Sequence, residues 1–224
     1  MVRLVASELM DDPQVDGAQL ARNFDDIERA NRWFGGVEPV LRAVFARGGE
    51  RLLDVGCGSA DIPRALVGEA RRRGRRLEVT GLDRSQTVLD IARARSGNDP
   101  FLKFVCAEGN ALPFDDASFD LTTCNLALHH FEPPEAIALL RELRRVARLT
   151  PLVCDLRRSP LGLAAARAYA ALFATSPLTR HDAPLSVQRA YTPGEALQLA
   201  RMAGWRTPQV SPSPFWRMLL YDAE

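Results

Sequence analysis

The sequence predicts an α/β fold with a doubly wound, mostly parallel sheet, and two observations lead to that prediction. Short, β-rich and largely apolar segments recur from residue 51 onwards, and segments with helical spacing separate them. Strands of a parallel sheet are buried on both faces, so they read as nearly continuous apolar runs. Alternating strands and helices imply right-handed crossovers with helices on both faces. Ligands of such sheets bind beyond the carboxyl ends of the strands.

The individual elements follow in order along the chain. Apolar residues at helical spacing over 17–47, broken at Gly35-Gly36, predict an N-terminal helical cap over residues 1–50. The expected strands are RLLDV, LEVTGLD, FLKFVCAE, FDLTTCNLAL and TPLVCDL, with helices near 61–73, 85–95 and 134–148. The remainder is expected to form a helical insert at 160–174, a loop at 175–191, a helix opened by Thr192-Pro193, and one or two edge strands between 205 and 221.

Composition excludes several classes of protein. The 224 residues are 46% hydrophobic and 25% charged with a net charge of +1, which is typical of a globular domain and not of a disordered or polyionic chain. Only Lys103 among the 29 basic residues is a lysine, but the arginines are spread among 28 acids, so no nucleic-acid partner is expected. No apolar stretch reaches the roughly 18 residues of a membrane span, and the first residues turn acidic too early for a signal peptide.

Cysteine usage points to a reducing compartment. Cys57, Cys106, Cys124 and Cys154 occur singly, without the paired spacing of zinc or redox sites, so we expect reduced, buried packing residues. Together with the composition, this predicts a cytoplasmic protein that is a monomer or a homodimer.

Residues 51–61, RLLDVGCGSAD, contain the most informative turn of the chain. In the dinucleotide fingerprint G-x-G-x-x-G, a pyrophosphate rests on the N-terminus of the following helix. Gly56 and Gly58 match that pattern, but Asp61 stands at the third glycine, and Asp54 adds a second negative charge. Since carboxylates repel phosphates, the turn predicts a cationic ligand. A dehydrogenase, a non-enzymatic cofactor-binding protein and a tight turn without a ligand remain alternatives.

This segment resembles the first motif of the class I methyltransferases that use S-adenosylmethionine, a ligand with an ammonium and a sulfonium group against one carboxylate. The likeness continues beyond the turn. LEVTGLD ends in Asp83, about 25 residues after Gly58, and CAEGNALPF is similar to the adenine-binding turn of the family. DDASFDLTTCNLALHHF resembles the quinone-biosynthesis-like branch of small-molecule enzymes. Two departures are Ala60, where a third glycine is usual, and RLTP at 148–151, where a Gly-Gly turn is common.

The resemblance, which covers about 51–155, implies a Rossmann-like, seven-stranded methyltransferase domain over 51–224 with S-adenosylmethionine as its cofactor. It places Asp54 near the methionine end of the cofactor and Asp83 at the ribose. A carboxylate can accept hydrogen bonds from both ribose hydroxyls. The cofactor-binding residues that it implies are Asp54, Gly56, Cys57, Gly58, Asp61, Asp83, Arg84, Gly109, Asn110, Ala111 and Asn125.

Methyl transfer from a sulfonium is an in-line displacement, so the protein mainly aligns the reactants and excludes water, and no metal is required. A hydroxyl or acidic-carbon acceptor benefits from a base. The three histidines, His129, His130 and His181, are the candidates. A structural role for the adjacent pair, and a turn-capping role for His181 with Asp182, remain open.

The insert, about 156–191, is where this branch builds its acceptor pocket together with the N-terminal helices. The candidate walls are Trp33, Phe34, Tyr169, Phe173 and Tyr191, and the nearby cations are Arg32, Arg157, Arg158, Arg180 and Arg189. These residues suit a mostly apolar small molecule that carries an oxygen or an acid.

The flanks, including ELMDDP, NRWFGG and RHDAPLSVQRAYT, resemble those of small bacterial methyltransferases of natural-product pathways. We therefore expect O-methylation of a phenolic or polyketide-like intermediate. C-methylation of a quinone- or enol-type acceptor is the alternative, and RNA or protein methylation is a more distant one.

Overall fold

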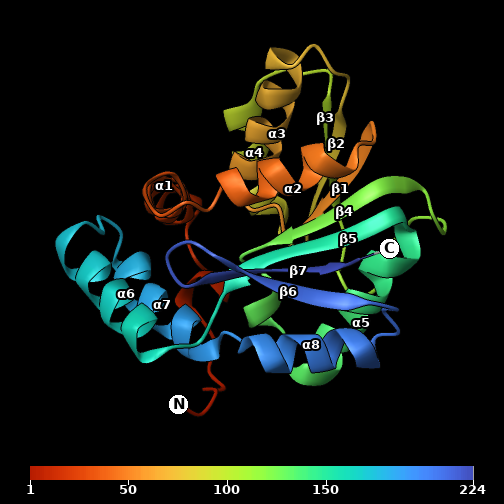
Figure 1. Ribbon diagram of the computed structural model, residues 1–224. Helices are drawn as coiled ribbons and strands as arrows, with labels where there is room; N and C mark the ends of the chain where they lie inside the picture. The colour runs from red at the N-terminus through yellow and green to blue at the C-terminus, as the bar shows by residue number, and fades with distance from the viewer. Residues whose placement is uncertain (224) are drawn as a thin grey trace.

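The computed structural model describes residues 1–223 and contains one seven-stranded sheet with helices on both faces (Figure 1). The strand order is β3-β2-β1-β4-β5-β7-β6, which confirms the doubly wound, mostly parallel sheet. Strands β1 to β5 pair in parallel, and β7 pairs antiparallel with both β5 and β6. The strands are β1 (Arg51–Val55), β2 (Glu78–Asp83), β3 (Leu102–Cys106), β4 (Phe119–Asn125), β5 (Ala147–Leu156), β6 (Pro208–Ser213) and β7 (Arg217–Asp222).

The helices lie close to the positions that the sequence predicts, with one exception in the insert. They are η1 (Leu9–Asp11), α1 (Gly17–Trp33), α2 (Glu38–Arg47), α3 (Asp61–Arg72), α4 (Gln86–Ser96), η2 (Leu128–His130), α5 (Pro133–Val146), α6 (Pro160–Leu172), α7 (Pro177–Arg189) and α8 (Pro193–Met202). Helix α5 runs directly into β5 without a turn, which is how the chain accommodates RLTP in place of a Gly-Gly connection.

Two apolar cores hold the sheet between its helices. Leu52 of β1 packs with residues of α2 and α3, whereas its neighbour Leu53 packs with residues of α5 and α8 on the opposite face. This alternation is the two-residue period of a strand whose faces are both covered. In Figure 1, α2 and α3 accordingly lie above the sheet, and α5 and α8 lie below it.

The C-terminal hairpin closes one side of the sheet. Strand β7 is inserted between β5 and β6, so only β6 is an edge strand there, within the predicted range of one or two. The tip between the two strands places Arg217 at the start of β7, beside Leu156 of β5.

The expectation of a loop at 175–191 is wrong, because α7 spans most of it. Its apolar residues do not gather on one face, and the side chains that it buries include Thr179, Asp182, Ser186 and Arg189. Hydrophobic periodicity therefore cannot reveal this helix, since tertiary hydrogen bonds rather than apolar contacts hold its buried polar groups. Pro184 inside the helix weakens the sequence signal further.

Two expectations about the whole chain can be compared with the structure. None of the helices within residues 1–223 has the length and apolar character to cross a membrane. All four cysteines are free, but Cys106 is exposed, so the expectation that the cysteines are buried holds for Cys57, Cys124 and Cys154 and is wrong for Cys106. Cys106 ends β3, which is an edge strand of the sheet, so no further strand covers it on one side.

Asp26 of α1 fastens the helical cap to the insert. Its carboxylate accepts hydrogen bonds from the Thr175 and Ser176 amides and from the Thr175 hydroxyl, each at 2.8 Å. The Tyr169 hydroxyl donates to the Asp26 carbonyl at 2.6 Å. Although burial alone would raise it, these hydrogen bonds hold the pKa of Asp26 below its ordinary value.

Replacing Asp26 with alanine should destabilise the protein by about 3 kcal/mol, because several hydrogen bonds to a buried charge are lost together. The adjacent Asp25→Ala is the control, because Asp25 makes only an exposed ion pair with Arg95. Urea unfolding above pH 5 measures both variants. Since the pKa of Asp26 is depressed, its contribution is present above the unfolded value near 4 and is lost as the pH falls through the folded value. Equal stability of the two variants would contradict this role.

Candidate functional site

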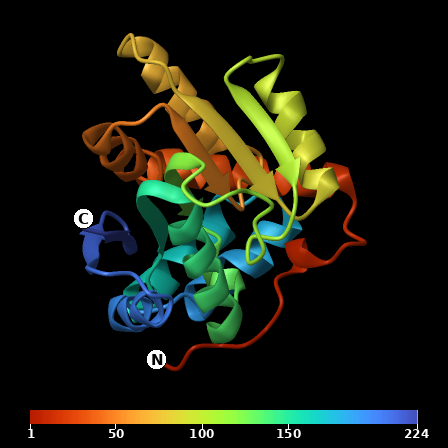
Figure 2. The same ribbon diagram turned by 90° about the vertical axis from the view of Figure 1, so that its right-hand side faces the viewer.

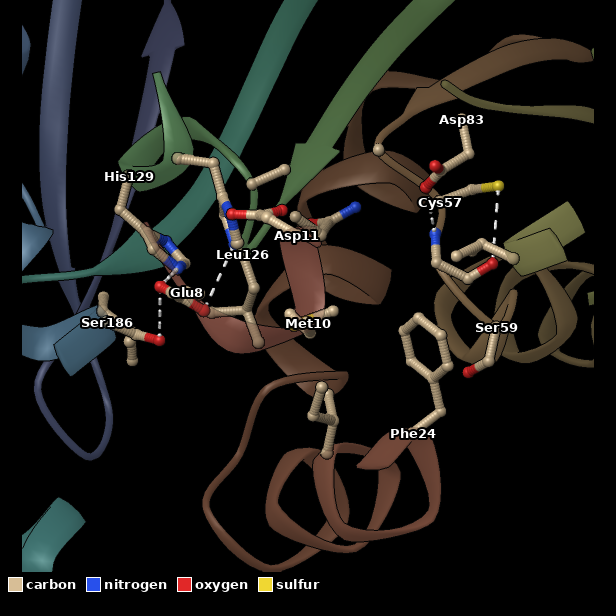
Figure 3. A pocket seen from close by; sticks show the side chains of 18 of the residues that line it. Glu8, Met10, Asp11, Phe24, Cys57, Ser59, Asp83, Leu126, His129 and Ser186 are labelled. Carbon is tan, nitrogen blue, oxygen red and sulfur yellow. Dashed lines mark hydrogen bonds and ion pairs between the residues drawn. The ribbon is translucent and has the colours of Figure 1, made fainter. Parts of the chain in front are cut away.

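A cavity of about 820 Å³ lies at the carboxyl ends of the central strands, where the strand order reverses between β1 and β4. Residues of the N-terminal segment, α1, α6 and α7 complete its walls. Its volume is in the range of small-molecule sites. Figure 3 shows two polar groups on opposite sides of this cavity, with Asp83 and Cys57 on one side and Glu8, His129 and Ser186 on the other.

The glycine turn after β1 forms one end of the cavity. Gly56 has φ +71°, and a Cβ there would lie 2.7 Å from the Cβ of Ala127, so no larger residue fits. The Gly56 and Cys57 amides donate to the Leu82 carbonyl at 2.8 and 3.0 Å, which ties the turn to β2. Ala60 keeps the left-handed conformation that a glycine adopts freely (φ 63°), so its departure from the family pattern leaves the course of the turn intact.

Asp83, at the end of β2, faces this turn. One carboxylate oxygen accepts from the Gly58 amide at 3.2 Å, and the other accepts from the Ser85 amide at 3.1 Å. Each oxygen keeps a further lone pair, as binding of two neighbouring hydroxyls requires. Burial raises the pKa of Asp83 above its ordinary value, with these hydrogen bonds opposing the shift.

Asp54, at the end of β1, is fully buried. Its Oδ1 accepts from the Thr123 hydroxyl at 2.6 Å and from the Asn125 amide nitrogen at 2.7 Å. Burial raises the pKa of Asp54 to about 7, and the negative charges of Asp61 and Asp83 add to that shift. Burial likewise raises the pKa of Asp61, whose Oδ2 accepts from Asn31 at 2.7 Å. This end of the cavity therefore holds carboxyl groups that a bound cation would ionise.

Most of the residues predicted for the site line this one cavity. They are Asp54, Gly56, Cys57, Gly58, Asp61, Asp83, Arg84, Gly109, Asn110, Asn125, His129 and His130. Ala111 and His181 are not among the lining residues. Ala111 is exposed, and the half-exposed His181 side chain lies on α7, where its Nδ1 is 2.8 Å from Asp182. The structure thus gives no catalytic contact to His181.

His129 lies at the other end of the cavity, buried next to Asp155 of β5. Its Nδ1 is 2.7 Å from Asp155 Oδ1, and its amide donates to Asp155 Oδ2 at 3.1 Å. Because an ionised carboxylate only accepts, His129 Nδ1 is the donor in this hydrogen bond. Although burial alone would raise it, the contact with His129 holds the pKa of Asp155 below its ordinary value, so this carboxylate remains charged.

His130 has a different environment. Its Nδ1 is 2.9 Å from Asp11 Oδ2, and Glu8 lies 3.7 Å from its Nε2. Burial opposes the charged ring, but Asp11 and Glu8 raise the pKa of His130 above 6.5. Near neutral pH, His130 therefore carries a proton more readily than an isolated imidazole does.

Glu8 joins both histidines and is one of the lining residues that sequence reasoning missed. Its Oε1 lies 3.6 Å from His129 Nε2 and accepts from the Ser186 hydroxyl at 2.9 Å. Ligand atoms of Glu8, His129 and His130 all lie within 4.8 Å of one another, a donor set of a type that zinc accepts. The 120 residues between Glu8 and His129 hide this proximity from the sequence.

Aromatic residues cover the insert side of the cavity. Phe34 and Tyr169, both predicted, line it with rings 5.6 Å apart, while Trp33, Phe173 and Tyr191 are not among the lining residues. The tip of the β6–β7 hairpin adds Phe215, whose ring is 5.5 Å from that of Phe34.

The predicted cations do not reach the cavity. The residues Arg32, Arg157, Arg158, Arg180 and Arg189 are absent from its lining, whereas Arg217 is present. No pattern in the sequence distinguishes Arg217 from the other arginines.

Comparisons with known proteins agree with this geometry. Residues 53–150 match a family described as "Methyltransferase domain". Residues 53–150 are therefore similar to a methyltransferase domain. Two solved structures that share the fold hold S-adenosylmethionine or S-adenosylhomocysteine, the cofactor and product that the resemblance predicts for this chain.

Individual relatives extend the comparison. A demethylmenaquinone methyltransferase of Bacillus subtilis is 34% identical over 113 residues, which are 50% of this chain and 46% of that protein. The match therefore spans about half the length of these curated relatives. Human N-acetylserotonin methyltransferase, crystallised with S-adenosylmethionine, has a TM-score of 0.72 at 17% identity and covers 97% of this chain and 59% of that one. A methyltransferase from Aquifex aeolicus has a TM-score of 0.66 at 19% identity, covering 93% and 98%. The two structures share the fold.

The raised pKa of Asp54 predicts that cofactor binding depends on pH. A carboxyl group with a pKa of about 7 must lose its proton to pair with a cation, so affinity for S-adenosylmethionine should rise about tenfold from pH 6 to pH 8, with proton release. Calorimetry in buffers of different ionisation enthalpy measures both effects. Asp54→Asn should weaken binding and remove this part of the pH dependence, and the difference between the two proteins cancels the titration of the ligand itself.

The same variant should raise the stability of the free protein. A group with a raised folded pKa loses stability as the pH rises from its unfolded value to its folded value, so Asp54→Asn should be the more stable form at pH 8, by roughly 2–4 kcal/mol. Asp120→Asn is the control. The Asp120 carboxylate accepts hydrogen bonds from the Glu50 and Arg51 amides at the opposite end of the sheet. An identical pH profile in wild type and Asp54→Asn would refute the assignment.

Proposed function

We propose that this protein transfers a methyl group from S-adenosylmethionine to an oxygen of a small, largely apolar acceptor, with His129 as the base. The observation that carries the proposal is the continuity of one cavity between the buried acids Asp54, Asp61 and Asp83 and the His129–Asp155 pair. One end suits a cationic donor, and the other offers a lone pair to the group that must lose a proton.

His129 is a better candidate for the base than His130. His129 Nδ1 donates to Asp155, and the ring lines the cavity with Nε2 on the side of Glu8. After proton transfer, the imidazolium would lie between Asp155 and Glu8, whose negative charges stabilise it. Asp11 and Glu8 raise the pKa of His130, so this ring is more protonated near neutral pH than an isolated imidazole, which makes it a poor base.

Aromatic and apolar walls support a phenolic or polyketide-like acceptor. Phe34, Tyr169 and Phe215 provide ring faces and edges on the insert side, which suit a flat, apolar molecule. The division of the chain into a helical cap (1–50) and a catalytic domain (51–224) stays a prediction. The cytoplasmic location of the protein stays a prediction as well.

C-methylation of a quinone- or enol-type acceptor is the second candidate. It is favoured by the name of the demethylmenaquinone methyltransferases, which match half of this chain at 32–34% identity. The same base would serve, because an enol hydroxyl also loses a proton when its carbon attacks the methyl group. RNA or protein methylation is a more distant alternative, for which the described cavity offers no specific support.

The two reactions can be separated with labelled cofactor. Incubation with S-adenosylmethionine carrying a ¹³C methyl group and a panel of phenols, enols and quinols should yield a product one methyl heavier. Carbon NMR of that product distinguishes a methoxy group from a methyl on carbon. No methylated product from any class, together with no cofactor binding, would reject the proposal.

Substitution of His129 should slow the chemical step without weakening cofactor binding. For His129→Ala we expect kcat to fall about 10²- to 10³-fold, because a base in general acid–base catalysis contributes an effect of that order. Asp155→Asn should lower kcat less, by disturbing the tautomer of His129. His130→Ala is the matched control and should lower kcat by less than about tenfold.

A chelator separates the base from a metal held by the same atoms. If His129 acts as the base, incubation with EDTA leaves kcat unchanged. Full turnover by His129→Ala would contradict the proposal. Loss of turnover in EDTA, restored by Zn²⁺, would instead assign Glu8, His129 and His130 to a metal ion.

A further inference from the structure

Arg217 is a buried cation that makes no ion pair with any acid among residues 1–223. Its side chain is 5% exposed, its Nη2 donates to Asn31 Oδ1 at 3.0 Å, and its Nε makes no hydrogen bond within residues 1–223. Burial lowers the pKa of Arg217, although the negative charges of Asp155 and Asp61 oppose the shift. A buried guanidinium that is not paired is costly, so a chain that keeps one has a use for its charge.

The surroundings of Arg217 place it at the cofactor end of the cavity. Asn31 joins it to Asp61, because the Asn31 amide accepts from Arg217 through Oδ1 and donates to Asp61 Oδ2 at 2.7 Å through Nδ2. Asp61 begins α3, directly after the glycine turn. Arg217 and Asp61 both line the cavity.

Gly36 packs directly against the contact between Asn31 and Arg217. A Cβ at Gly36 would lie 2.6 Å from Asn31 Oδ1 and 2.9 Å from Arg217 Nη1. The backbone at Gly36 therefore leaves just enough space for the amide and the guanidinium to meet.

The pair of charges is complementary to an α-amino acid. A cation and an anion, held on the two ends of one amide and not in contact with each other, match a carboxylate and an ammonium attached to a single carbon. Among residues 1–223, Asp61 makes no ion pair within 4 Å, and burial raises its pKa, with the more distant charge of Arg64 among the effects opposing the shift. We infer that Arg217 binds the α-carboxylate of the methionyl group of S-adenosylmethionine, with Asn31 and Asp61 positioning the ammonium beside it.

This inference rests on the proposed use of S-adenosylmethionine. It adds the residue that binds the carboxylate of the cofactor. Arg217 is a binding residue for the cofactor and takes no part in proton transfer. It would anchor the methionyl group against the β6–β7 hairpin.

Three ligands test the inference by calorimetry. S-adenosylhomocysteine carries both the carboxylate and the ammonium, S-adenosyl-3-thiopropylamine lacks only the carboxylate, and 5′-methylthioadenosine lacks both. Arg217→Met should bind S-adenosylhomocysteine about 10- to 100-fold more weakly, the range expected when hydrogen bonds to a charged group are lost. Its affinity for the other two ligands should stay within about twofold of wild type, and Arg217→Lys should recover part of the loss.

Two further variants complete the experiment. Asp61→Asn should weaken binding of S-adenosylhomocysteine and of the thiopropylamine, but not of 5′-methylthioadenosine. Arg158→Met is the matched control, because Arg158 is buried, pairs with Glu195 and does not line the cavity, so all three affinities should remain unchanged. Since Met replaces an unpaired buried charge, Arg217→Met should melt no lower than wild type when free of ligand.

The possible failures are distinguishable. No binding of S-adenosylhomocysteine by the wild-type protein would reject the proposed function itself. Equal loss of all three ligands in Arg217→Met would assign Arg217 a structural role and overturn the inference. Unchanged affinities for all three, with a higher KM for an acidic acceptor, would show that Arg217 binds the acceptor instead, and would overturn the inference as well.

Discussion

The structure depends on carboxyl groups held without water at the ends of β1 and β2. Asp54 is 1% exposed, and burial raises its pKa to about 7. Folding therefore bears the cost of desolvating these groups before any ligand arrives, and a cation can recover that cost. A pyrophosphate would instead add repulsion between its own negative charge and these carboxylates. The same glycine turn that serves dinucleotides in other sheets thus favours a positively charged donor here, because Asp54 and Asp61 flank it.

The acceptor end is built from parts of the chain that are far apart in sequence. The N-terminal segment runs along the outside of the molecule before it reaches α1 (Figure 2), and η1 is held there by Asp182, which accepts from the Leu9 and Met10 amides at 2.9 and 3.0 Å. This attachment delivers Glu8 and Asp11 to the two histidines. The polar face of α7, which weakens its signal as a helix, is the surface that receives the segment. The attachment of η1 to α7 thus fixes the positions of the two acids that face the histidines.

The hairpin tip closes the cavity at a conformational cost. Phe215 and Trp216 have φ values of 53° and 59°, a left-handed conformation that costs non-glycine residues about 1 kcal/mol or more each. Tight packing holds them there, since a Cβ on Gly162 would lie only 3.2 Å from Trp216 and Phe215 meets Phe34. Strain of this kind persists where the surrounding structure compensates for it, and it concentrates at ligand sites. In this protein it accompanies the placement of Arg217 at the first position of β7.

The sequence alone determined the sheet, the cofactor turn and the assignment of Asp54 and Asp83 to one edge, because these features depend on short-range patterns: apolar runs, glycine spacing and acids at strand ends. The tertiary structure alone decided that α7 is a helix, that His181 lies outside the cavity, and that Glu8 and Arg217 lie inside it. The physical reason is the range of the interactions. Hydrophobic periodicity and turn chemistry are local, whereas the pairing of buried charges is fixed only when the chain has folded and brought together side chains more than a hundred residues apart.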